Sequence, residues 1–175
     1  MQTRLMTASD LGNPVAGEGP PVEFEYYDSD EQLSRIIDSH LEHLREEGIS
    51  PSEITLLTAR PLPNSSLQRT GIWRRRVVTV IDTGVAADWP APGLTCAAVA
   101  DFKGLENKFI LLLDLEFEGP PSMVANLMYV GMSRAQVGLW VAVPRSAKAH
   151  LATLAQGNAS KALAPPSVPN RSTHK

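Results

Sequence analysis

Cysteine is almost absent from this 175-residue sequence, which contains only Cys96. One cysteine cannot form an internal disulfide or a zinc site built from several thiolates, and this usage fits a reducing compartment. No apolar run approaches the roughly 20 residues that a membrane-spanning helix needs, and the first 21 residues lack the apolar core of a signal peptide. We therefore predict a cytoplasmic protein with no membrane partner.

A surplus of basic charge is also missing. The chain has 16 Lys and Arg against 19 Asp and Glu, which gives a formal net charge of -3. A stand-alone nucleic-acid-binding domain usually carries a basic surplus. Any contact with nucleic acid must therefore be local.

Several catalytic signatures do not occur. The sequence lacks the phosphate loop G-x-x-x-x-G-K-[ST], the dinucleotide fingerprint G-x-G-x-x-G and a hydrolase-type serine motif, so the chain cannot cradle the phosphates of a nucleotide unaided. His40 and His43 have a helical spacing that could chelate a metal, but no third ligand converges on them. The sequence predicts no metal site.

The patterns that are present alternate between strand and helix, which is typical of a parallel α/β sheet. Val22–Tyr27 alternates apolar and acidic residues and predicts a half-buried strand near a sheet edge. Apolar residues three and four apart predict a helix over 33–44, closed by Gly48. Further strands are predicted at Ile54–Thr58, 77–81, 94–100, 110–115 and 137–143, and further helices from 118–122 to Arg134 or Ala135 and over 145–154.

Composition divides the chain into three parts. Residues 1–21 are rich in Gly and Pro and predict a flexible leader, and residues 156–175 predict a disordered tail. Residues 22–155 hold the strand and helix patterns. Because 43% of the chain is hydrophobic, this middle part can bury a core of its own as one domain.

Two short stretches are the strongest candidates for chemistry. Arg134 follows an apolar helix and directly precedes a strand, and Glu106 ends Lys103-Gly104-Leu105-Glu106 just before another strand. Open α/β sheets bind ligands beside their central strands, which favours a functional role for both residues. Two other interpretations stay open: Arg134 as a surface arginine favoured by the helix dipole, and Glu106 as an exposed loop carboxylate.

These two stretches resemble motifs V and VI of the UvrD/Rep/PcrA-like superfamily 1 DNA helicases. Phe102-Lys103-Gly104-Leu105-Glu106 is similar to the motif V pattern K-G-L-E-F. Leu127-Met128-Tyr129-Val130-Gly131-Met132-Ser133-Arg134-Ala135 is similar to the motif VI pattern L-x-Y-V-[AG]-x-[ST]-R-A. The resemblance covers roughly residues 22–143, with Ile54–Thr58 in the region of motif IV.

The resemblance implies a second RecA-like lobe, the C-terminal half of an ATPase that binds its nucleotide between two such lobes. The expected fold is a three-layer, RecA-like α/β domain of the P-loop NTPase type with a mainly parallel central sheet. Arg134 would be the arginine finger, supported by Tyr129 and Ser133. Glu106 would accept a hydrogen bond from the ribose, and Gly104 would allow close approach of the backbone. Lys103 would make local contacts or contacts with phosphate. The cofactor would be ATP with Mg²⁺, held mainly by a first RecA-like lobe in the same longer chain or in a separate subunit, so the isolated chain is expected to be inactive.

Single-stranded DNA is the second partner that the resemblance implies. Arg60 is a candidate for the motif IV arginine. Trp73, Arg74, Arg75 and Arg76 combine an aromatic ring with three cations, as a single-strand groove does, although a solvated turn would have the same sequence. The chain departs from the family at Ala98 and Ala100, where DNA-contacting Thr and His are common, and at Asn107, where an aromatic residue is common. These departures favour the alternative of a non-catalytic module that binds DNA or protein.

Overall fold

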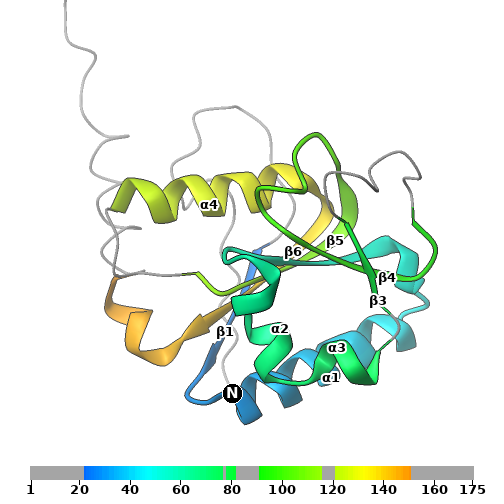
Figure 1. Cartoon of the computed structure of the whole chain (residues 1–175), viewed down its shortest axis with the longest axis horizontal. Coiled ribbons are helices and arrows are strands. Elements are labelled where there is room, and N and C mark those ends of the chain that lie inside the picture. Colours follow the sequence, from blue (N-terminus) through cyan, green and yellow to red (C-terminus); the bar gives the residue numbers. More distant parts are fainter. Residues whose placement is uncertain (1–21, 77, 82–90, 116–120, 151–175) are drawn as a thin grey trace, which may run out of the picture.

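The computed structural model describes residues 22–76, 78–81, 91–115 and 121–150. The predicted leader, the predicted tail and Val77 lie outside the described residues. The described part forms a sheet with helices on both of its faces (Figure 1). Its strands are β1 (Val22–Tyr27), β2 (Ile54–Thr58), β3 (Val78–Val80), β4 (Leu94–Ala98), β5 (Asn107–Leu113) and β6 (Ala135–Pro144). Its helices are α1 (Asp30–Glu46), η2 (Pro51–Glu53), η3 (Leu62–Asn64), α2 (Ser66–Arg69), α3 (Ile72–Arg75), α4 (Pro121–Arg134) and η5 (Arg145–Ala147).

The six strands pair in the order β1-β6-β5-β2-β4-β3, and every described pair is parallel. This arrangement confirms the predicted three-layer α/β class with a parallel sheet. It also confirms β1 as an edge strand. Because all six strands run the same way, their amino ends form one edge of the sheet and their carboxyl ends form the other.

Three predicted strands had wrong boundaries. The strand predicted at 137–143 begins two residues earlier, at Ala135, and ends at Pro144. The strand predicted at 94–100 ends at Ala98, because the chain turns there and the carbonyl of Ala98 accepts bonds from the amides of Asp101 and Phe102. The strand predicted at 110–115 begins three residues earlier, at Asn107, and ends at Leu113, because Asp114 adopts a left-handed φ of 59°. Such a φ interrupts extended backbone.

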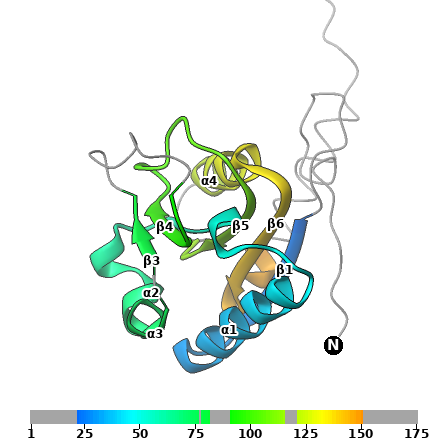
Figure 2. The same cartoon turned by 90° about the vertical axis from the view of Figure 1, so that its right-hand side faces the viewer.

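The layers follow from the alternation of side chains along each strand. Leu56, Leu111 and Trp140 belong to the apolar cluster under α1, α2 and α3. Their neighbours Leu57, Leu112 and Val141 belong to the cluster on the opposite face, where Leu127 of α4 packs. Figure 2 shows α1, α2 and α3 on one side of the sheet and α4 on the other. Both faces of the sheet are therefore buried, as expected for parallel strands.

Helix α1 begins where Ser29 accepts a bond from the amide of Gln32. The helix buries Leu33, Ile37, Leu41 and Leu44 along one face. It ends beside Gly48, whose φ of +82° matches the predicted closure by glycine. The local patterns in the sequence were thus enough to locate this helix.

The segment 99–106 determines where the candidate residues lie. It has only eight residues in which to return from the carboxyl end of β4 to the amino end of β5, with β2 between the two strands. Phe102 is fully buried on the α4 face, and Leu105 packs against the same cluster. Because Phe102 and Leu105 are fixed in this cluster, the segment ends with Glu106 at the amino edge of the sheet.

Candidate functional site

Arg134 and Glu106 come from separate stretches that the sheet brings together. Asn107, the first residue of β5, is the Cα partner of Ala135, the first residue of β6. Arg134 and Glu106 each stand one residue before this pair. The amino edge of the sheet between β5 and β6 therefore carries both residues, and we call it the β5–β6 amino edge.

An irregularity in β6 lies directly after Arg134. The register changes between the pairs Asn107–Ala135 and Phe109–Gly138, so β6 holds one extra residue there, a β-bulge at Gln136 and Val137. Bulges redirect side chains and are common beside functional sites. Here the side-chain amide of Gln136 donates to Oε2 of Glu106 at 3.2 Å.

The guanidinium of Arg134 is mounted on the last turn of α4. Gly131 allows this turn to lie close to β5, because a Cβ at this position would be 2.9 Å from Cδ2 of the fully buried Leu112. Arg134 Nε is buried and has no hydrogen-bond partner among the described residues. A buried donor without a partner is costly, so this nitrogen is chemically suited to an acceptor from outside the described chain.

Tyr129 and Ser133 were expected to support Arg134. The hydroxyl of Ser133 donates to the carbonyl of Val130 in its own helix, at 2.9 Å. The side chain of Tyr129 is 56% exposed. Arg134 is therefore positioned by the close approach of α4 to β5 and by the start of β6.

Asn107 stands where the helicase pattern has an aromatic residue. Its buried side-chain amide donates to the carbonyl of Ser52 at 3.1 Å and to Oγ1 of Thr55 at 3.0 Å. The Thr55 hydroxyl is also 2.7 Å from that of Thr95. This polar network ties the start of β5 to β2 and β4, and so fixes the backbone beside Glu106.

Gly104 and Lys103 precede Glu106 on the exposed side of the same segment. Gly104 has a φ of +84°, a conformation that L side chains rarely adopt. No atom lies within 4 Å of where its Cβ would be, so the glycine is required by backbone conformation and not by crowding. Lys103 is exposed, which leaves its ammonium group accessible.

Sequence reasoning missed Asn107 and Gln136. An amide in an otherwise apolar strand was the available signal for Asn107. No sequence pattern pointed to Gln136, because its contact depends on the bulge. Arg134 and Glu106 lie at the amino ends of β6 and β5. Open α/β sheets generally bind ligands at the carboxyl ends of their strands, so this general rule does not account for the position of either residue.

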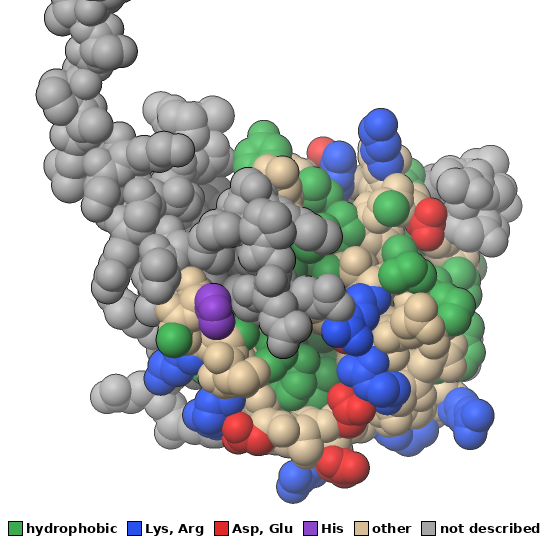
Figure 3. All heavy atoms as spheres, turned by 60° about the vertical axis from the view of Figure 1, so that its left-hand side comes forward, with side chains coloured by type: hydrophobic (Ala, Val, Ile, Leu, Met, Phe, Trp, Pro, Cys, Tyr) green, Lys and Arg blue, Asp and Glu red, His purple; other side chains and the backbone are tan. Residues whose placement is uncertain are grey.

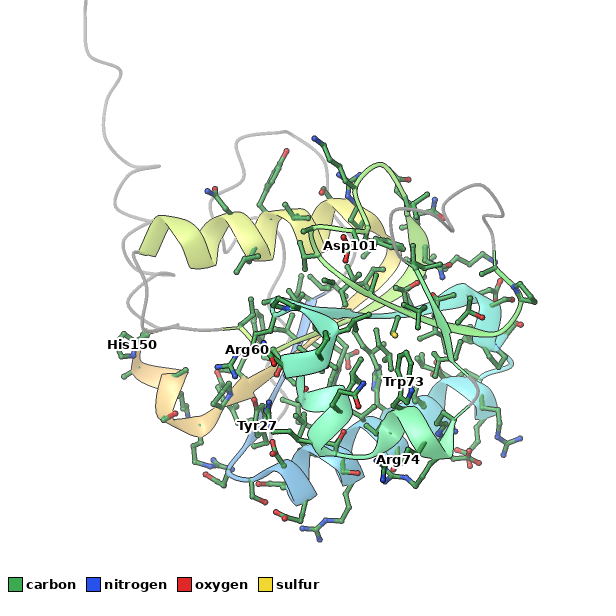
Figure 4. The ribbon with its side chains drawn as sticks, in the orientation of Figure 1. Tyr27, Arg60, Trp73, Arg74, Asp101 and His150 are labelled. Atoms are coloured by element: carbon green, nitrogen blue, oxygen red, sulfur yellow. The ribbon has the colours of Figure 1, made fainter. Side chains whose placement is uncertain are left out.

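Arg60 lies at the opposite edge of the sheet, because it follows the carboxyl end of β2. It therefore does not join Arg134 and Glu106 at the β5–β6 amino edge. Figure 4 shows Arg60 and Tyr27 in the same part of the molecule. The pKa of Tyr27 is raised to about 12, chiefly by burial and then by the charge of Asp114, against the opposing effects of Arg69 and Arg60.

Asp114 is the buried acid of this carboxyl edge. Its carboxylate accepts from the amide of Ser66 at 3.0 Å and from the Ser66 hydroxyl at 3.1 Å. Arg69 Nη2 is 3.8 Å from the same carboxylate. Burial raises the pKa of Asp114, against the opposing effects of these bonds and of Arg69 and Arg60. Asp114 thus holds the loop after β2 against the end of β5.

The predicted aromatic and basic stretch falls on α3 and the residue after it (Figure 4). Arg75 Nη2 and Arg76 Nη2 lie 2.9 Å and 3.0 Å from the carboxylate of Asp38 in α1. Trp73 packs against the apolar cluster under α1, and Arg74 is exposed. Two of the three cations thus hold α3 against α1, which a solvated turn or a simple basic groove would not require.

The charged surface also lacks a uniform sign on the face that Figure 3 shows. Lys and Arg side chains there alternate with Asp and Glu side chains. This agrees with the net charge of -3. The described residues visible on that face form no broad basic track of the kind that binds nucleic acid without help.

The two helix histidines differ in their surroundings. The ring of His40 stacks on Trp140 with centroids 5.0 Å apart, and burial followed by the nearby His43 lowers its pKa to about 4. His43 is more exposed and lies 3.4 Å from Glu47. Within the described ranges, no three Asp, Glu, His or Cys side chains are grouped closely enough to hold a metal ion.

Of the helices in the described part of the chain, none combines the length and the apolar character that crossing a bilayer demands.

Comparison with known proteins supports the fold. No protein-family model matches the sequence, and no curated protein matches it. Among solved structures, the chain is similar to the crystal structure of the C-terminal domain of a possible DNA helicase from Lactobacillus plantarum WCFS1. The TM-score is 0.57 and the sequence identity is 18%, over 78% of this chain and 80% of that chain. At this identity the likeness shows a shared fold, that of a three-layer RecA-like domain.

The groups at the β5–β6 amino edge suit both anions and hydroxyl donors. Arg134 offers a planar cation with a buried, unpaired N–H, which suits phosphate oxygens. Glu106 offers carboxylate oxygens, which suit hydroxyl donors. The sequence contains no phosphate-binding loop of the form G-x-x-x-x-G-K-[ST].

Proposed function

We propose that this chain is the second RecA-like lobe of a UvrD/Rep/PcrA-like superfamily 1 DNA helicase. In this role it contributes Arg134 and Glu106 to an ATP site that it shares with a first lobe. The observation that carries the proposal is the Asn107–Ala135 pair, which places the two residues side by side at one edge of the sheet. The motif resemblance and the helicase domain with the same fold support it.

The proposed chemistry divides between the lobes. ATP with Mg²⁺, held mainly by the first lobe, supplies the phosphoryl group that is hydrolysed. Arg134 stabilises the negative charge that develops on that group, through a guanidinium that is held in advance by α4 and β6. Glu106 accepts a hydrogen bond from a ribose hydroxyl, while Gly104 permits close approach and Lys103 adds positive charge near the phosphates.

Single-stranded DNA is the proposed substrate of the complete helicase. Arg60 and Arg74 are candidates for contacts with its phosphates. Arg75 and Arg76 both pair with Asp38. Ala98 and Ala100 replace side chains that contact DNA in the family. Most of the affinity for DNA is therefore expected from the assembled protein.

The test uses a two-lobe enzyme, made of the full chain and its first lobe. The first lobe is identified by the motif G-x-x-x-x-G-K-[ST] in the coding sequence that is in frame with this chain or adjacent to it. Arg134→Ala is expected to lower ATP turnover about a thousandfold or more, because arginine fingers contribute about 10³–10⁵ in rate. Nucleotide affinity should change little. The matched control is Arg145→Ala. Arg145 is an exposed arginine that follows the carboxyl end of β6 and pairs with Asp28, so it lies at the opposite edge of the sheet from Arg134.

Two results would contradict the proposal. Unchanged ATP turnover in Arg134→Ala would favour the alternative, a non-catalytic module that keeps the scaffold and binds DNA or protein. The absence of any coding sequence for a first lobe, in frame or adjacent, would favour the same alternative.

A further inference from the structure

The contact between Gln136 and Glu106 joins the two motif-like stretches through their side chains. Gln136 Nε2 donates to Glu106 Oε2 at 3.2 Å, across 30 positions of sequence. Backbone pairing links the same stretches one residue away, at Asn107 and Ala135. The β5–β6 amino edge is thus crossed by a main-chain connection and a side-chain connection next to each other.

The bulge in β6 makes the side-chain connection possible. With regular pairing, Lys108 would face a single residue of β6, but the register change places Gln136 and Val137 opposite it. A bulged residue leaves the regular alternation of the strand, and its side chain is redirected. In this structure the side-chain amide of Gln136 is hydrogen-bonded to the carboxylate of Glu106, the residue before β5.

We infer that Gln136 is a positioning residue, which fixes the Glu106 carboxylate in the orientation that reads a ribose hydroxyl. The inference rests on the proposed function, because it assigns a partner to the residue that contacts the nucleotide there. The substrate class that follows is a ribonucleoside triphosphate, recognised through its sugar hydroxyls at this point and not through its base.

The hydrogen-bonding capacity of the groups supports this role. A carboxylate has two acceptor oxygens, and the Gln136 amide occupies one of them, Oε2. The other oxygen, Oε1, can accept from a hydroxyl. Glutamine is neutral, so it restricts the rotation of the Glu106 side chain without cancelling the charge that attracts the donor. A carboxylate that is already oriented loses less conformational entropy when the nucleotide binds.

The experiment uses the two-lobe enzyme and compares ATP with 2′,3′-dideoxy-ATP, which lacks both sugar hydroxyls. Gln136→Met keeps the length of the side chain and removes the donor. We expect KM for ATP to rise about fivefold, the effect of losing one modest hydrogen bond, with kcat unchanged. KM for the dideoxy nucleotide should not change. Gln136→Asn, which keeps a neutral amide donor on a side chain one methylene shorter, should raise KM for ATP less than Gln136→Met does.

A double-mutant comparison isolates the pair. In a Glu106→Ala background, Gln136→Met should have no further effect on KM for ATP, because the group that it positions is gone. If Gln136→Met raises KM for both nucleotides by the same factor, or changes neither KM, Gln136 does not act through Glu106 and the inference is overturned. An additive effect in the double mutant overturns it as well.

Failure of the inference and failure of the proposed function give different results. Arg134→Ala is measured in the same preparation. If it abolishes turnover while Gln136→Met leaves the ratio of the two KM values unchanged, the helicase-lobe proposal stands and the role of Gln136 is wrong. If Arg134→Ala leaves turnover intact, the proposed function is wrong and the positioning role falls with it.

Discussion

Gly104 and Gly48 are two glycines with nearly the same backbone. Their φ angles are +84° and +82°, and no atom lies within 4 Å of a Cβ built on either. Only their places differ: Gly104 is two residues from Glu106, whereas Gly48 follows α1. They therefore form a matched pair for separating backbone strain from function.

We predict that alanine at either position lowers the free energy of unfolding by about 1 kcal/mol, the cost of a left-handed conformation for a residue with a Cβ. Only Gly104→Ala should also raise KM for ATP in the two-lobe enzyme, since strain there shifts Lys103 and Glu106. Denaturant unfolding and steady-state kinetics of both variants measure the two effects. Equal KM values would show that the segment 103–106 does not contact the nucleotide.

The residues of the candidate site were predictable to different degrees. Arg134 and Glu106 were found because each belongs to a contiguous pattern of several residues. Gln136 was missed because its role depends on strand register, and Asn107 was noted only as a departure. The pairing of Arg76 with Asp38 joins positions that are distant in the sequence, and one sequence carries no sign of it.

At the scale of elements, α1 docks on the sheet through an aromatic contact as well as through aliphatic side chains. His40 stacks on Trp140 of β6, at an interplanar angle of 20°. Burial, and secondarily His43, lowers the pKa of His40 from 6.5 to about 4. The folded protein therefore binds fewer protons at this site than the unfolded chain does between these two pH values.

This difference predicts a pH dependence of stability. The contribution of His40 is fully present above pH 6.5 and is lost as the pH falls toward 4, by roughly 3 kcal/mol in total. His40→Phe keeps a ring on Trp140 and cannot be protonated, so its stability should fall less over this range. Urea unfolding at several pH values measures the difference. His43→Phe on the same helix is the control: it removes only the secondary cause of the shift, so most of the slope of the natural chain should remain.

The elements themselves were largely predictable, because apolar periodicity and capping residues are local. α1 and the strands β1 and β2 lie where the patterns predicted them. The ends of β4 and β5 were misplaced, because a turn after Ala98 and a left-handed aspartate at 114 decide them. The bulge of β6 has no local signature, since it is defined only against its partner strand.

At the scale of the whole molecule, the proposed ATP site is incomplete. The sequence has no phosphate loop, and the described candidate residues occupy a single edge of the sheet. We predict that the isolated chain shows no ATP turnover above background and that adding the first lobe restores it. A phosphate-release assay on the chain, on the first lobe and on their mixture measures this. Turnover by the chain alone would contradict the shared-site proposal.

The parallel class of the sheet was predictable from the alternation of strands and helices, but the order of its strands was not. Order depends on which strands are neighbours in space, and the described sheet interleaves early and late segments of the chain. The separation of Arg60 from Arg134 follows from this topology. Only the three-dimensional arrangement shows that these two arginines lie at opposite edges of the sheet, Arg60 at the carboxyl edge and Arg134 at the amino edge.

The position of β1 has a consequence for how the protein is made. β1 is the first described strand, and the only strand it pairs with in the described sheet is β6, the last one. During synthesis, β1 emerges from the ribosome long before its partner exists. Its apolar side chains, Val22 and Phe24, cannot be covered in the native arrangement until β6 has been synthesised. Closure of the sheet is therefore a late step in folding, set by the slow formation of its most distant pairing.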